Sequence, residues 1–174
     1  MRLLKFILFL PFIFSCEKEI DRAKIVYNGG SHQASSRSDN EFRRLLNSKK
    51  KTDDYFVRFS HNSRYLINNP NGKPYMGWNK IGGTFKPTVN PSNSFGVHDD
   101  SYRMVWRYSP LDTSYGIAYY QYQDGERRWH VIQDGIKEGE VAMIPNFKLK
   151  YAFVSEPYFG GVYEAPHDVI IEIW

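Results

Sequence analysis

Short runs of alternating apolar and polar residues make up most of the chain from Tyr55 onward. A period of two residues places alternate side chains on opposite faces, as in a half-buried β-strand. Many short strands with no helical pattern between them predict one all-β domain over residues 54–174, an antiparallel sandwich or barrel. The runs, separated by turns rich in Asn, Pro, Asp and Gly, are YFVRFS, RYLI, YRMVWRY, YGIAYYQY, ERRWHVI, EVAMI, FKLKYAFV and DVIIEIW.

The dipeptide Asp124-Gly125 joins two of these runs and predicts a tight hairpin. Asp-Gly is a favoured two-residue turn because both positions need a positive φ. This register places Tyr120 opposite Trp129, where the two rings would form an exposed aromatic surface for the stacking of sugar rings. Ordinary core packing is the alternative for Trp129. The same register pairs Tyr122 with Arg127 and Ala118 with Val131.

The run at residues 101–108 also alternates. Its aromatic side, which includes Trp106, is expected to face the core. Arg103 and Arg107 lie on the other side, and guanidinium groups bind carboxylates or sulfates in a bidentate manner. A solvated outer face is the alternative reading of these two arginines.

The N-terminus has the three-part layout of a secretory signal peptide. Arg2 and Lys5 precede an apolar run that ends at Phe14, followed by Ser15 and Cys16, the only cysteine of the chain. The run is shorter than the roughly 20 apolar residues that span a bilayer. Residues 1–15 are therefore predicted to be a removable signal peptide.

The tetrad IFSC that ends at Cys16 resembles a bacterial lipoprotein processing box. The resemblance implies that the Cys16 thiol is lipidated and that the mature chain is attached to the membrane. Each buried CH2 of an acyl chain contributes about 0.8 kcal/mol to such an anchor. The acidic pair Glu17 and Glu19 is similar to the surface-export tag of Bacteroidetes lipoproteins, which implies the outer membrane and exposure at the cell surface.

Residues 16–53 are interpreted as the lipidated N-terminus and a flexible tether, because the stretch NGGSHQASSRSDN has no apolar period. A short helix is expected within the tether. Ser38 and Glu41 have the spacing of a capping box, and Phe42, Leu45 and Leu46 follow at helical intervals.

The charge balance argues against a nucleic-acid partner. Removal of Arg2 and Lys5 with the signal peptide lowers the formal charge from +4 to +2. A nucleic-acid-binding domain would carry a strongly basic stripe. Aromatic residues make up 17% of the chain, which suits both strand cores and carbohydrate-binding surfaces.

Three stretches together are similar to a family of small, uncharacterised Bacteroidetes lipoproteins. The resemblance covers most of residues 77–174 and implies a β-sandwich of jelly-roll type, exported and lipid-anchored, with no assigned activity. Tyr119 and Gln121 depart from the family pattern, which has smaller residues there. The stretches are GWNKIGG, then HDDSYRMVWRY with AYYQYQDGER, and finally PYFGGVYEAPHDVIIEIW.

No motif for a metal, a cofactor, a thiol nucleophile or a serine nucleophile is present in residues 54–174, so neither a cofactor nor a metal is expected. The preferred hypothesis is a non-catalytic protein that binds a glycan or a partner protein of the cell envelope. The residues expected to bind are Tyr120, Tyr122, Trp129, Arg103 and Arg107.

Two alternatives stay open. One is a polysaccharide lyase acting on uronate polymers, in which a base removes the C5 proton and a polar group neutralises the carboxylate. Tyr120 or His98 would be its base, and Arg103 with Asn79 its neutralising groups. The other is a structural subunit of an envelope complex, which would present an apolar surface patch.

Overall fold

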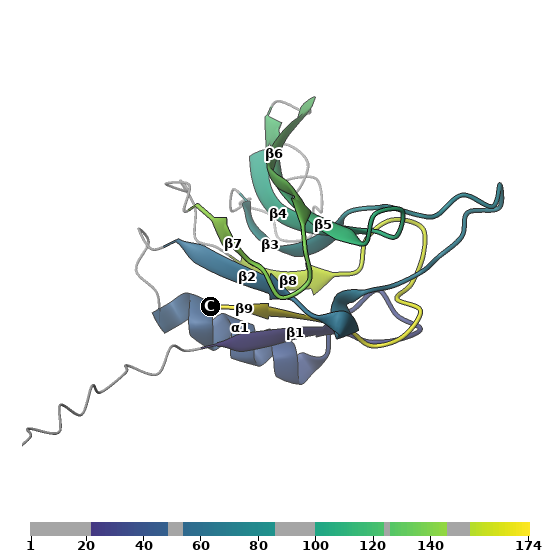
Figure 1. Ribbon diagram of the computed structural model, residues 1–174. Coiled ribbons are helices and arrows are strands. Elements are labelled where there is room, and N and C mark those ends of the chain that lie inside the picture. The colour runs from purple at the N-terminus through teal and green to yellow at the C-terminus, as the bar shows by residue number, and fades with distance from the viewer. Residues whose placement is uncertain (1–21, 49–53, 86–99, 124–125, 146–153) are drawn as a thin grey trace, which may run out of the picture.

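The computed structural model describes residues 22–48, 54–85, 100–123, 126–145 and 154–174. Two antiparallel sheets pack face to face, as the alternation of the sequence predicted (Figure 1). The four-stranded sheet has the order β1 (Ala23–Tyr27), β9 (Val169–Ile173), β2 (Tyr55–Phe59), β7 (Val141–Ile144). The five-stranded sheet has the order β6 (Glu126–Ile136), β5 (Ser114–Gln123), β4 (Asp100–Ser109), β3 (Asn79–Phe85), β8 (Val154–Tyr158).

The chain crosses repeatedly between the two sheets. The first and last strands, β1 and β9, pair with each other, and β2 and β7 extend the same sheet on the other side of β9. Strands β3 to β6 follow one another in the other sheet, β7 returns to the first sheet, and β8 then joins the other sheet beside β3. This arrangement is an antiparallel β-sandwich, in which distant parts of the sequence become neighbours.

The core lies between the sheets and is built from the inward-facing residue of every second strand position. Strands β1, β2 and β9 alternate buried and partly exposed residues along their length. Aromatic rings fill the centre: Phe59 stacks on Tyr115 at 4.4 Å between centroids and lies 5.4 Å from Trp106. The predicted core side of β4 is confirmed, since Met104, Trp106 and Tyr108 are all buried.

The helix α1 (Ser36–Ser48) contacts β1 and β8, which are edge strands of the two sheets (Figure 1). Phe42 and Leu45 are buried and belong to the core. The predicted helix is therefore confirmed, but it begins at Ser36, so Ser38 lies inside it and is not its cap. A short 3-10 helix, η1 (His61–Ser63), follows β2.

The interpretation of residues 22–48 as a flexible tether is wrong. Ala23, Ile25 and Tyr27 on β1 are buried against β9, a strand from the far end of the chain. The Gly-rich loop that follows is also attached, because Gly30 N–H donates to Ala165 O at 2.7 Å and Phe159 N–H donates to His32 O at 2.8 Å. These hydrogen bonds make the segment part of the sandwich.

The predictions for the signal peptide and for Cys16 concern residues outside the described part of the chain. Within the described ranges, no helix has the length and apolar character needed to cross a bilayer.

Candidate functional site

The outer face of the five-stranded sheet carries a continuous set of side chains. The sequence predicted the strands β4, β5 and β6 that carry most of them, but not that these strands lie in one sheet with β3 and β8. Directly opposite residues of antiparallel strands share a face. One row across the sheet joins Tyr158, Lys80, Val105, Ala118 and Val131, and the next joins Arg103, Tyr120 and Trp129. The predicted pairing of Tyr120 with Trp129 is confirmed, as is that of Ala118 with Val131.

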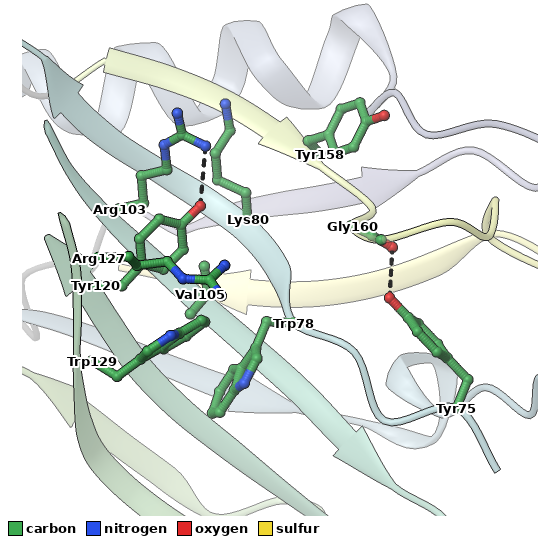
Figure 2. A pocket seen from close by; sticks show the side chains of 11 residues that line it. Tyr75, Trp78, Lys80, Arg103, Val105, Tyr120, Arg127, Trp129, Tyr158 and Gly160 are labelled. Carbon is green, nitrogen blue, oxygen red and sulfur yellow. Dashed lines mark hydrogen bonds between the residues drawn. The ribbon is translucent and has the colours of Figure 1, made fainter. Parts of the chain in front are cut away.

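Most residues of these rows line a cleft of about 460 Å³, which we call the outer cleft; Ala118 and Val131 are not among its lining residues. Ligand pockets of proteins commonly have volumes of about 300 to 1,000 Å³. Figure 2 shows the residues that line it, which come from β3, β4, β5, β6 and β8 and from the segments that precede β3 and follow β8. The described residues that line it are Tyr75, Trp78, Lys80, Arg103, Val105, Tyr120, Arg127, Trp129, Tyr158, Gly160 and Gly161.

Three aromatic rings form one connected surface in the outer cleft. The centroid of Trp129 lies 4.8 Å from that of Tyr120 and 5.7 Å from that of Trp78, with the rings inclined at 48° and 34°. Stacked groups each need about 3.5 to 4.0 Å of separation, so a sugar ring has no room between the two tryptophans. A ligand would lie across the three rings.

Arg103 and Arg107 project from the same face of β4, as the alternation predicted. Arg103 Nη1 donates a hydrogen bond to the Tyr120 hydroxyl at 3.0 Å (Figure 2), and its guanidinium lies over the rings of Tyr120 and Tyr122 at 5.6 and 5.7 Å. Arg107 pairs with Asp134 at 2.6 Å and lies 4.7 Å from the centroid of Trp78. Both arginines thus hold aromatic rings of the outer cleft in place.

A buried polar network fixes the backbone around Trp78. Asn79 has no exposed surface; its amide donates to the Tyr65 hydroxyl at 3.1 Å and accepts from Gly160 N–H at 3.0 Å. The Tyr65 hydroxyl in turn donates to Gly77 O at 3.3 Å. Burial raises the pKa of Tyr65 to about 12, so this hydroxyl stays protonated at neutral pH.

Glycines admit Tyr75 at one end of the outer cleft. The Tyr75 hydroxyl donates to Gly160 O at 3.2 Å (Figure 2), and a Cβ at Gly77 or Gly161 would overlap this hydroxyl. Gly161 also has a φ of 80°, which side chains rarely adopt. Burial, and next the neighbouring Tyr163, raise the pKa of Tyr75 above its usual value.

The residues predicted to bind a ligand fall into two groups. Arg103, Tyr120 and Trp129 line the outer cleft. Tyr122 and Arg107 contact lining residues from beside it. Of the residues proposed for a lyase, Arg103 and Tyr120 are in contact, Asn79 faces the core with its amide bonded, and His98 lies outside the described residues.

Sequence reasoning did not single out Trp78, Lys80, Tyr75 or Tyr158. Trp78 directly precedes β3 and Lys80 is the second residue of that strand, so period-two spacing was the signal that could have joined them. Tyr75 and Tyr158 reach the site through contacts between distant segments, that of Tyr75 with Gly160 and the pairing of Tyr158 with Lys80. No local pattern reports such contacts.

Within the described ranges, no group of three or more His, Cys, Asp or Glu side chains is placed to hold a metal ion. The side chains that line the outer cleft supply aromatic faces, guanidinium and ammonium groups, and phenol hydroxyls.

No protein-family model, curated protein or solved structure shows a significant match to this chain.

Proposed function

We propose that this protein is a non-catalytic glycan-binding protein and that the outer cleft is its binding site. The observation that carries the proposal is the connected surface of Trp78, Tyr120 and Trp129 on the outer face of the sheet. Trp129 keeps 38% of its surface exposed, although burial of so large an apolar side chain is favourable. Sugar rings stack their C–H faces on such aromatic surfaces, while hydroxyl groups bond to the polar rim.

The test is binding of the mature chain, carrying Cys16→Ser, to a panel of neutral and acidic polysaccharides in glycan-containing native gels. We expect retardation by at least one polymer, and Trp129→Ala should weaken it about tenfold or more, as for a central contact residue. His130→Ala is the matched control, because His130 lies opposite Tyr119 in the same pair of strands, one position away, on the other face. Equal losses in both variants would contradict the proposed site.

A second candidate function is supported by one contact. Arg103 donates to the Tyr120 hydroxyl at 3.0 Å, so two of the four residues proposed for a uronate lyase are in contact in the outer cleft. Tyr120, acting as the phenolate, would take the C5 proton while Arg103 neutralises the neighbouring carboxylate. The C5–H electron pair would form the C4=C5 double bond as the C4–O4 bond breaks, and the departing O4 would take the proton from the Tyr120 hydroxyl, which leaves an unsaturated uronate and restores the phenolate. New ultraviolet absorbance in the polysaccharide mixtures, abolished by Tyr120→Phe, would replace the binding proposal with this one. A complete absence of both binding and absorbance would direct the search to protein partners of the envelope.

We further propose that the domain is attached to a bacterial outer membrane through lipidated Cys16. Since β1 begins at Ala23, only seven residue steps separate the anchor from the sandwich, at most about 25 Å of extended chain. Cys16→Ser should abolish lipid labelling and membrane retention, whereas Ser15→Ala should preserve both. A labelled Cys16→Ser protein would contradict the anchor.

A further inference from the structure

Positive charge is the second chemical feature of the outer cleft. Among the described residues that line it, Lys80, Arg103 and Arg127 are cationic and none is acidic. They lie around the aromatic surface, Lys80 and Arg103 on one side and Arg127 over Trp129 (Figure 2). A neutral sugar needs no such charge, because its hydroxyls are satisfied by neutral donors and acceptors.

Arg127 differs from the other arginines of this face. Arg107 is neutralised by Asp134, and Arg103 is bonded to Tyr120. Arg127 is exposed. Its guanidinium lies over the face of Trp129, 5.1 Å from the ring centroid. A cation–π contact at an exposed site is weak, so a ligand can draw the guanidinium away from the ring.

This placement couples charge to stacking. A ligand that lies across Trp129 meets Arg127 first, because the guanidinium covers one face of the ring. A ligand with an anionic group can pair with the guanidinium and use the ring at the same time. A neutral ligand has to displace the guanidinium and forms no ion pair with it in exchange for the lost contact.

We propose that the outer cleft selects sugars that carry an anionic group, a carboxylate or a sulfate, and that Arg127 binds this group. The inference rests on the proposed glycan binding and names the class of glycan. Arg127 acts as the residue that distinguishes acidic from neutral polymers, while Trp78, Tyr120 and Trp129 provide contacts common to both.

The experiment compares polymers that differ only in charge. One pair is polygalacturonate and its fully methyl-esterified form, and the other is a sulfated galactan and its desulfated form. We expect the acidic member of at least one pair to bind about tenfold more tightly in low salt, and this advantage to shrink as ionic strength rises. The pair that shows the difference identifies carboxylate or sulfate as the recognised group.

Two variants assign the effect to a residue. Arg127→Gln should remove the preference for the acidic polymer, whereas Arg128→Gln should preserve it, because Arg128 is the adjacent exposed arginine on the opposite face of β6. Equal binding of charged and neutral polymers, or a preference that survives Arg127→Gln, would overturn the inference and leave glycan binding intact. No binding to any polymer by the parent protein would overturn both.

Discussion

Trp106 and Trp129 occupy neighbouring parts of one sheet and have opposite surroundings. Trp106 on β4 faces inward with no exposed surface, and its Nε1 donates to the Tyr27 hydroxyl at 3.0 Å. Trp129 on β6 faces outward, 38% exposed, against Tyr120 and Trp78. The same residue type thus supports the fold on one face of the sheet and belongs to an exposed aromatic surface on the other.

The two faces also treat polar groups differently. On the inner side, Tyr27 accepts from Trp106 and donates to Lys80 O at 2.9 Å, and Asn79 uses both ends of its amide. A buried polar group without such partners would cost about 1 to 3 kcal/mol. On the outer side, Arg127 and Trp129 remain accessible to a ligand. The polar groups of the inner side are therefore bonded within the fold, whereas Arg127 and Trp129 on the outer side can contact a ligand.

The largest expected effect separates the two tryptophans. Trp106→Ala should lower the free energy of unfolding by about 3 to 5 kcal/mol, because it leaves a cavity in the centre of the core. Trp129→Ala should lower it by less than about 1.5 kcal/mol and should mainly reduce glycan binding. Urea denaturation of both variants measures the difference, and a loss of more than about 3 kcal/mol in Trp129→Ala would place Trp129 in the structural core.

The next effect concerns the network that connects the two faces. Asn79→Leu removes the partner of Gly160 N–H and one donor to Tyr65, so we expect a loss of about 2 to 4 kcal/mol. Glycan affinity should fall as well, because Trp78 loses its support. Asn62→Leu is the control, since Asn62 is exposed on η1. A fully stable Asn79→Leu protein would show that the network does not hold the site.

Alkaline pH should destabilise the inner face. Burial raises the pKa of Tyr65 to about 12 and also raises the pKa of Tyr27 and Tyr115. Above about pH 10 the unfolded chain releases these protons while the folded chain retains them, so stability falls as pH rises. Each tyrosine contributes at most about 1.4 kcal/mol per pH unit.

Urea midpoints between about pH 8 and pH 11 measure this dependence. Stability should be flat with respect to these groups below about pH 9 and should fall above about pH 10. Tyr115→Phe should make the fall less steep, at the cost of the hydrogen bond from Tyr115 to Ser60 O. An unchanged slope in Tyr115→Phe would mean that Tyr115 ionises as readily in the folded chain as in the unfolded one.

The smallest effect tests the outer ion pair. Asp134→Asn weakens the pairing with Arg107, and partly exposed pairs contribute only about 0 to 1 kcal/mol to stability. The more informative change is in glycan binding, which should weaken a few-fold because Arg107 no longer holds Trp78 as firmly. Glu126→Gln is the control, since Glu126 pairs loosely with Arg128 at 4.0 Å. Equal glycan affinities of Asp134→Asn and Glu126→Gln would show that the ion pair of Arg107 does not position Trp78.

The parts of the fold predicted correctly depend on local backbone geometry. The hairpin register of β5 and β6 and the two sides of β4 followed from period two and from one Asp-Gly turn. The segment AKIVY was missed as a strand because five residues carry little pattern of their own. It becomes a strand by pairing with β9, almost 150 residues later in the chain.

The sequence by itself determined which side chains share a face, since every second residue of an extended backbone points the same way. Period two placed Arg103 with Arg107, and the Asp-Gly turn placed Tyr120 with Trp129. Only the tertiary structure decided which segments cover the inner face, because β1, β9 and α1 come from remote parts of the chain to complete the core around Trp106. Only the tertiary structure made the outer cleft, because Gly160 and Tyr75 reach its rim through long-range contacts that no local pattern encodes.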